Sequence, residues 1–209
     1  MKKNTTLTLV LLSVIFILGC GQGSGPDDPR HYFLMEVQRE GISQASTQDM
    51  VLLVRPFALS PGYHSKELTY RTGSSQYESD YYNQFIIDAG RQIGEQTRLW
   101  LTKSGIFAHV VPTGSTMSAT HLLEGNITQL YGDFRDKTNA QAVMSITFYL
   151  LDITERNPKM ITSKTFDVSV PITEAKAESV IEAYNRGLKQ ILGKLEVSMQ
   201  QTDLSKKEQ

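Results

Sequence analysis

The sequence of 209 residues has one cysteine, Cys20, so no disulfide bond can form within the chain. Its four histidines are scattered, and none has a second histidine or a cysteine at the spacing of a metal site. There is no Gly-x-Ser-x-Gly sequence, no phosphate-binding glycine loop and no cysteine in a catalytic pattern. We therefore expect a protein that is not an enzyme and that holds neither a metal nor a cofactor.

Runs of one charge sign are also absent. The chain has 21 Lys and Arg against 22 Asp and Glu, and no segment is a basic block, so no nucleic-acid partner is expected. Removal of a leader that contains Lys2 and Lys3 leaves 19 basic and 22 acidic residues. A mildly acidic mature protein has no long-range attraction to anionic lipid, so any membrane contact needs another source.

The one long apolar run lies at the N-terminus, from Leu7 to Leu18, after two lysines. It is too short to span a bilayer and predicts a secretory signal peptide over residues 1–19. Ile17-Leu18-Gly19-Cys20 resembles a bacterial lipobox, whose cysteine is acylated, although Leu18 is bulkier than usual at its place. A free thiol and an intermolecular bridge are the alternatives for Cys20. Its position directly after the apolar run favours an acyl anchor that holds the protein on the membrane.

The rest of the chain predicts one domain. Residues 20–30 form a flexible tether without apolar side chains to bury, residues 31–199 form the domain, and residues 200–209 form a polar tail. The predicted strands are His31–Val37, Val51–Val54, Ile106–Val111, Thr120–Tyr131 with a bulge near Thr128, Ala142–Ile153 and Thr165–Ile172. The predicted helices are Asn83–Lys103, and Glu174–Met199 with Thr173 as its cap.

Both predicted helices are amphipathic, and covering the sheet is the expected use of their apolar faces. The regular stripe of the last helix could instead bind a membrane or a partner helix. The lone tryptophan, Trp100, belongs to such a face and is expected in the core. Gly90 and Gly94 lie one turn apart and should allow close approach to the sheet. The order of elements predicts an α+β fold in which a single mixed, mainly antiparallel sheet is covered by two helices, with a protruding β-hairpin.

The hairpin lies in the most distinctive stretch, Val51–Phe85. Glu67–Arg71 and Gln76–Tyr82 are predicted to pair around Thr72-Gly73-Ser74-Ser75, a connection of hairpin length that contains a glycine. Five of the nine tyrosines fall in this stretch, and tyrosine combines a large apolar area with a polar tip. The candidate partner-binding residues are Tyr63, Tyr70, Arg71, Tyr77, Tyr81 and Tyr82. Composition leaves open whether these side chains contact a partner or pack against one another.

Charged residues of the same stretch have simpler expected uses. Arg55 and Arg71 bracket the hairpin and are expected to pair with Glu67, Glu78 or Asp80. Glu78 and Asp80 face the same side of a predicted strand and could form an acid/base pair. Carboxylates on a solvated hairpin are common, however, so a structural use is favoured over catalysis.

Four segments of this stretch resemble a family signature. They are Val54-Arg55-Pro56-Phe57, Ser60-Pro61-Gly62-Tyr63, Leu68-Thr69-Tyr70-Arg71 and Tyr77-Glu78-Ser79-Asp80-Tyr81-Tyr82-Asn83-Gln84-Phe85. The string is similar to that of the ABC-type transport auxiliary lipoproteins, the family of paraquat-inducible protein C, over essentially all of the mature chain. The resemblance implies a non-enzymatic envelope component that works with an ABC transporter and a mammalian-cell-entry (MCE) domain protein in lipid movement between the two membranes of a Gram-negative cell.

The resemblance also bears on location and partners. Gly21 follows Cys20 where an aspartate retains enterobacterial lipoproteins in the inner membrane, which implies an anchor in the outer membrane with the domain on the periplasmic face. A role as docking or accessory subunit is expected. The alternatives are a periplasmic module that shelters an acyl chain between sheet and helices, and a structural subunit of a secretion pore. Phospholipid binding and homo-oligomer formation both stay open.

Overall fold

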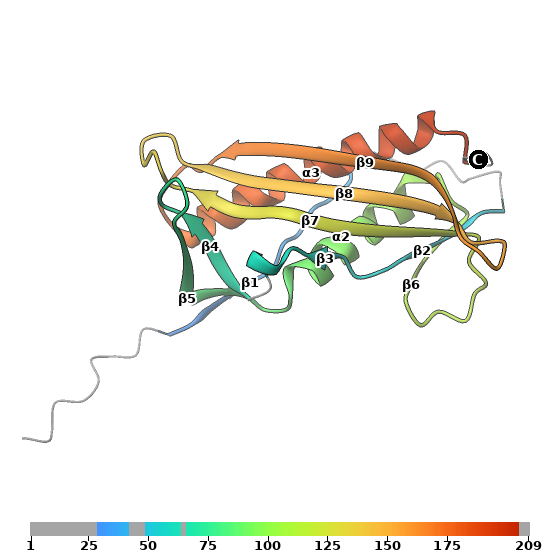
Figure 1. Ribbon diagram of the computed structural model, residues 1–209, viewed down its shortest axis with the longest axis horizontal. Coiled ribbons are helices and arrows are strands. Elements are labelled where there is room, and N and C mark those ends of the chain that lie inside the picture. Colours follow the sequence, from blue (N-terminus) through green and yellow to red (C-terminus); the bar gives the residue numbers. More distant parts are fainter. Residues whose placement is uncertain (1–28, 42–48, 64–65, 205–209) are drawn as a thin grey trace, which may run out of the picture.

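The structure, a computed structural model, describes residues 29–41, 49–63 and 66–204. Its elements are β1 (His31–Phe33), β2 (Val51–Val54), β3 (Ala58–Leu59), the 3-10 turn η1 (Pro61–Tyr63), β4 (Glu67–Arg71), β5 (Tyr77–Phe85), α2 (Ala89–Ser104), β6 (His109–Pro112), β7 (His121–Asp133), β8 (Gln141–Asp152), β9 (Lys159–Pro171) and α3 (Ala177–Gln201). The nine strands form one sheet, and both helices lie behind it in Figure 1. This is the predicted mixed α+β fold. The predicted signal peptide and Cys20 lie outside the described residues.

The longest part of the sheet is the antiparallel meander of β7, β8 and β9. Along β8, the side chains of Met144, Ile146, Phe148 and Leu150 are buried, as their period of two predicted. The predicted bulge in β7 is confirmed, because the register shifts between Ile127 and Gln129. Thr128, the extra residue, donates a hydrogen bond of 3.0 Å from its hydroxyl to that of Ser145.

Three short strands share the other edge of β7, and all run parallel to it. Leu52 of β2 pairs with His121, Ala58 of β3 with Asn126, and Tyr70 of β4 with Gly132. One stretch of chain therefore follows β7 from its beginning to its end. Beyond β4, the strand β5 turns back antiparallel, and β1 pairs with β5 in parallel at the outer edge.

The helices pack as their apolar faces predicted. The apolar stripe of α3 lies under β8 and β9, and Leu188, Ile191 and Leu192 have no exposed surface. In α2, a Cβ added at Gly90 would lie 2.2 Å from the carbonyl oxygen of Phe57, so the helix touches the backbone between β2 and β3. The predicted close approach of this helix to the sheet is confirmed.

A buried polar contact joins the two helices to the N-terminal segment. Trp100 is in the core as predicted, and its indole N–H donates a hydrogen bond of 2.7 Å to Glu196. The guanidinium of Arg39 donates to both oxygens of the same carboxylate, at 2.8 and 2.9 Å. The Arg39 hydrogen bonds lower the pKa of Glu196, and burial works against this effect.

Both predicted helix starts are wrong. Residues 83–85 belong to β5 and not to α2, because β1 pairs with them and holds them extended. The helix begins at Ala89, where the Asp88 side chain accepts a hydrogen bond from the Arg91 backbone N–H. At the other helix, Thr173 is not the cap: α3 begins at Ala177, and Lys176 stands at the cap position without a side-chain cap bond.

Three predicted strands also have clearly different bounds. The last strand, β9, begins at Lys159 and not at Thr165, because the residues before Thr165 already pair with β8. Ile106–Val111 is replaced by β6, which starts at His109 and includes Pro112. The first strand ends at Phe33 instead of Val37, because the residues after Phe33 bond to side chains and not to a neighbouring strand. Side-chain oxygens of Gln92, Asn185 and Gln96 accept hydrogen bonds from the backbone N–H groups of residues 35, 36 and 37, in that order.

Candidate functional site

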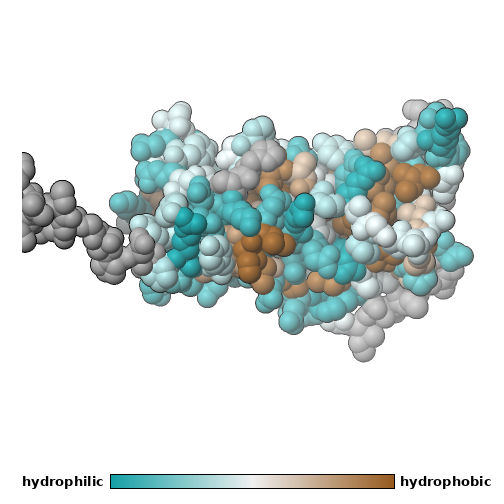
Figure 2. All heavy atoms as spheres, turned by 90° about the horizontal axis from the view of Figure 1, so that it is seen from below, coloured by the Kyte–Doolittle hydropathy of each residue, from teal (hydrophilic) through white to brown (hydrophobic). Residues whose placement is uncertain are grey.

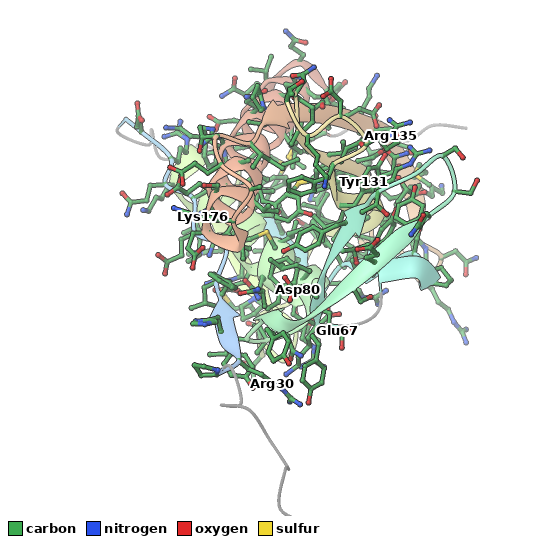
Figure 3. All side chains as sticks on the ribbon, turned by 90° about the vertical axis from the view of Figure 1, so that its left-hand side faces the viewer. Arg30, Glu67, Asp80, Tyr131, Arg135 and Lys176 are labelled. Carbon is green, nitrogen blue, oxygen red and sulfur yellow. The ribbon has the colours of Figure 1, made fainter. Side chains whose placement is uncertain are left out.

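The predicted hairpin is confirmed as β4 and β5, and it closes one end of the molecule (Figure 3). At its tip, the Thr72 N–H bonds to the Gln76 carbonyl at 3.0 Å. The Arg71 guanidinium donates to the carbonyls of Gly73 and Ser74, at 3.3 and 2.6 Å. Arg71 therefore stabilises the turn instead of pairing with a carboxylate.

The predicted ion pairs of the hairpin are wrong for both arginines. Arg55 lies outside the hairpin and pairs with Glu124 of β7 at 2.5 Å. Glu78 accepts hydrogen bonds from Thr72 and Gln76, at 3.0 and 3.3 Å. Sequence spacing could not show the partner of Arg55, since it depends on which residue of β7 faces that arginine.

Asp80 organises the base of the hairpin. The register jumps there from the pair Glu67 and Gln84 to the pair Leu68 and Asp80, so part of β5 bulges out. One oxygen of Asp80 accepts from the backbone N–H groups of Tyr82 and Asn83, at 3.0 and 3.1 Å. The other oxygen accepts from the Tyr70 hydroxyl at 3.0 Å and from the Asn83 amide at 2.8 Å. With these four bonds, Asp80 is a structural acceptor.

Aromatic rings cover the outer face of the hairpin near its tip. Tyr131 of β7 lies beneath, stacked on Tyr63 at 6.3 Å and in edge contact with Tyr77 at 5.5 Å between ring centroids. The Arg71 guanidinium lies 5.6 Å from the centre of the Tyr77 ring and 6.0 Å from that of Tyr131. Burial raises the pKa of Tyr63 to about 12. We call Tyr63, Arg71, Tyr77 and Tyr131 the tip cluster; within it, the Tyr77 side chain is the most exposed ring, at 45%.

Tyr70 points to the opposite face of the hairpin. Its ring meets Phe134 edge-on at 5.4 Å, and burial together with the Asp80 carboxylate raises its pKa. It lines a cavity of about 530 Å³ between the hairpin, the chain after β7 and the start of α3. Figure 3 labels Asp80 of β5 and Lys176, at the start of α3, at this end of the molecule. The lining residues are His31, Tyr70, Thr72, Asp80, Tyr82, Asn83, Phe134, Lys137, Ala175, Lys176, Ala177, Glu178 and Val180.

Tyr81 and Tyr82 lie apart from the tip cluster, at the base of the hairpin. Their rings meet edge-on at 5.3 Å, and both side chains are exposed. The guanidinium of Arg30 lies 4.2 Å from the centre of the Tyr81 ring. The six predicted contact residues therefore divide among the outer face, the inner cavity and the base.

Sequence reasoning missed three contributors to this end of the molecule. Tyr131 and Phe134 come from β7 and the chain after it, and Arg30 comes from the segment before β1. For Tyr131, the predicted bulge near Thr128 was the available signal. A bulge reverses which residues face outward after it, and it turns the Tyr131 ring to the outer face. No local pattern in the sequence links Arg30 to the hairpin.

Among the described residues, no three His, Cys, Asp or Glu side chains are grouped as a metal site requires. Within the same part of the chain, no helix is long and apolar enough to cross a bilayer.

Comparisons with known proteins place this geometry in a family. The family described as ABC-type transport auxiliary lipoprotein component matches residues 32–195. No curated protein sequence matches the chain. A solved structure from Xanthomonas campestris has a TM-score of 0.67 and 16% identity, covering 82% of this chain and 98% of its own. An uncharacterised protein has a TM-score of 0.64 and 12% identity, with 82% and 99% covered. These two show a shared fold, and the family match shows membership: the chain belongs to the ABC-type transport auxiliary lipoprotein components.

Proposed function

We propose that this lipoprotein is a membrane-anchored accessory subunit of an ABC and MCE-type intermembrane lipid transport system. Acylated Cys20 holds it on the periplasmic face of the outer membrane, and the folded domain docks onto the MCE-domain component. Family membership supports the transport role. The lipobox-like sequence before Cys20 supports the anchor, and Gly21 supports the outer membrane.

The tip cluster is the observation that carries the docking role. Tyr77 is exposed and rests on Tyr131, so its ring is held in one position before any partner arrives. Arg71 flanks it on one side, and Arg135, bound to Asp133 at 2.6 Å, stands close by on the chain after β7. Exposed tyrosine and arginine side chains that are already held in place are the residues that dominate the energy of protein interfaces.

The proposed role requires no bond-breaking chemistry. The carboxylates that could have acted as acid and base, Glu78 and Asp80, are occupied by hydrogen bonds within the hairpin. The family is likewise described by transport and not by a reaction. The hairpin supports this role by holding its aromatic side chains in fixed positions for binding.

A pull-down tests the docking surface. Tyr77→Ala should weaken association with the MCE component by about thirty-fold, the effect of losing a contact worth about 2 kcal/mol. Tyr149→Ala is the matched control, because that tyrosine lies on the outer face of the meander, away from the hairpin. Equal association of the two folded variants would show that the tip cluster is not the interface.

The cavity beside Tyr70 supports a second role, the binding of lipid by the domain itself. Its wall joins the apolar groups of Phe134 and Val180 to the ammonium groups of Lys137 and Lys176, and it also includes the carboxylates of Asp80 and Glu178. That lining fits an amphiphile with a zwitterionic head. Domain released from its anchor and recovered from cells should then carry lipid that mass spectrometry detects, and spectra free of lipid would count against this role.

A further inference from the structure

Exposed apolar side chains gather at the base of the hairpin. Of the large apolar residues exposed in the described part of the chain, six lie on β1 or directly after it, in the second half of β5, and in the segment that leads to α2. They are Tyr32, Leu34, Tyr81, Tyr82, Ile86 and Ile87, each between 44% and 55% exposed. We call these six the base patch. Figure 2, seen from below Figure 1, shows apolar residues grouped among hydrophilic ones on this side of the molecule.

The pairing of β1 with β5 brings these residues together. Tyr32 pairs with Gln84, and the Ile86 N–H donates a hydrogen bond of 3.0 Å to the Phe33 carbonyl. Successive residues of a strand face opposite sides, so Phe33 packs against the core while Tyr32 faces away from it, and Leu34, directly after the strand, is also exposed. The same alternation buries Phe85 and leaves Ile86 in solvent.

Two cations border the base patch. Arg30 lies over the ring of Tyr81, and the Lys66 ammonium donates a hydrogen bond of 3.0 Å to the Ile86 carbonyl. Long basic side chains of this kind keep their stems on apolar surface and place their charge at the level of lipid phosphates. Tyrosine is the residue enriched at the boundary between water and hydrocarbon. The composition of the base patch therefore matches a bilayer interface.

The route of the chain supplies the second argument. Arg30 at the base patch is ten residues beyond Cys20. A flexible tether of that length has a mean end-to-end distance of about 17 Å, so an anchor at Cys20 keeps the base patch within reach of the bilayer surface. The hairpin tip lies at the far end of β5 from Phe85, and a strand of that length spans about 25 Å.

We propose that the base patch rests on the phospholipid bilayer that holds the N-terminal acyl chains. Ile86, Ile87 and Leu34 enter the boundary of the acyl region, and Arg30 and Lys66 reach the phosphates. This inference rests on the acyl anchor of the proposed function. It adds an orientation, because a domain seated on its base patch directs the tip cluster away from the membrane, toward a partner in the periplasm. With 19 basic and 22 acidic residues in the mature chain, apolar burial and not net charge drives the contact.

Spin labelling of the full lipoprotein tests the seating. Acylation consumes the thiol of Cys20, the one cysteine of the chain, so Ile87→Cys creates a single labelling position. The labelled protein is reconstituted in vesicles of phosphatidylethanolamine with a minor share of phosphatidylglycerol. The accessibility of the label to oxygen, divided by its accessibility to a water-soluble nickel complex, reports depth. Ser163→Cys on the exposed edge strand β9 is the matched control.

The base-patch label should have a ratio several-fold above the control label, and the ratio should change little between low and high salt. Equal ratios at the two positions would overturn the inference. So would a label at position 87 that stays in water on vesicles and becomes shielded when the MCE component is added, because the base patch would then be a protein interface. A parent protein that takes up label at Cys20 would instead contradict the acyl anchor of the proposed function.

Discussion

The meander of β7, β8 and β9 and the hairpin of β4 and β5 are both antiparallel, yet they use their side chains in opposite ways. In the meander, apolar residues alternate toward α3 and are buried. In β5, nearly every residue from Tyr77 to Gln84 is at least partly exposed. The hairpin keeps its shape through hydrogen bonds to Asp80 and carbonyl contacts of Arg71. Leu68 and Phe85 reach the core, whereas most of the other hairpin side chains are available for contacts, and we expect the meander to supply most of the stability.

The strongest test of this comparison is a substitution that creates a cavity where α3 packs on the meander. Leu188 of α3 has no exposed surface, and Leu188→Ala should lower the free energy of unfolding by about 4 kcal/mol. Tyr77→Ala in the hairpin should lower it by less than about 1 kcal/mol, because the ring is half exposed. Urea unfolding followed by circular dichroism measures both. Similar losses in the two variants would remove the distinction between scaffold and contact surface.

The second test removes the charge that joins the N-terminal segment to the helices. Arg39→Ala leaves the Glu196 carboxylate, 12% exposed, with the Trp100 N–H at 2.7 Å and the Gln200 amide at 3.5 Å. The loss of the guanidinium should cost about 3 kcal/mol. The pKa of Glu196 is lowered in the folded protein, so its contribution is complete above the unfolded value of about 4.3 and is lost as pH falls through the folded value.

A pH series of urea midpoints checks the sign. Stability of the natural protein should fall as the pH drops below about 4, and Arg39→Ala should flatten that fall. An unchanged acid profile in the variant would mean that other carboxylates dominate.

The third test compares two helical glycines. Gly90→Ala should destabilise by about 2 kcal/mol, because the new Cβ would meet the Phe57 backbone at 2.2 Å and outweigh the gain in helix propensity. Gly193→Ala is the matched control in α3, where nothing lies within 4 Å, and it should stabilise by about 0.7 kcal/mol. Thermal melts of both variants give the two signs, and a stabilising Gly90→Ala would contradict the tight contact of α2.

The fourth test removes one hydrogen bond at the base of the hairpin. Tyr70→Phe removes one hydrogen bond to Asp80, which retains three others, and should cost about 1 kcal/mol. Amide exchange near Tyr82 and Asn83 should become faster while the β8 amides keep their rates. Faster exchange throughout the meander would show that the two regions are not independent.

Local patterns predicted most of the fold. The period of two in β8 and β9 and the spacing of apolar residues in both helices are set by burial on one face, so they can be read from the chain alone. The predicted helix starts were wrong because contacts with residues remote in sequence decide where a helix begins. At residues 83–85, the amphipathic pattern predicts helix, but pairing with β1, which is remote in sequence, holds the chain extended.

The candidate site was predicted less completely. The hairpin and its tyrosines were identifiable, because the turn residues and aromatic density are local features. The sequence did not predict how these tyrosines distribute among the outer face, the cavity and the base of the hairpin. That distribution depends on a bulge at Asp80 and on rings from Tyr131 and Phe134. These contacts follow from the register between β4 and β7, which no segment encodes alone.

The shared edge of β7 also has a consequence for the order of assembly. β8 and β9 follow β7 after short turns, whereas Val51 meets Thr120 across 69 residues. Closing that long loop is the slower step, so we expect the C-terminal meander to form first and then to serve as the template on which β2, β3 and β4 align. Pulsed hydrogen exchange during refolding should protect β8 amides before those of β2. Synthesis delivers the strands in the opposite order, so β2, β3 and β4 stay unpaired until the meander that serves as their template has been made.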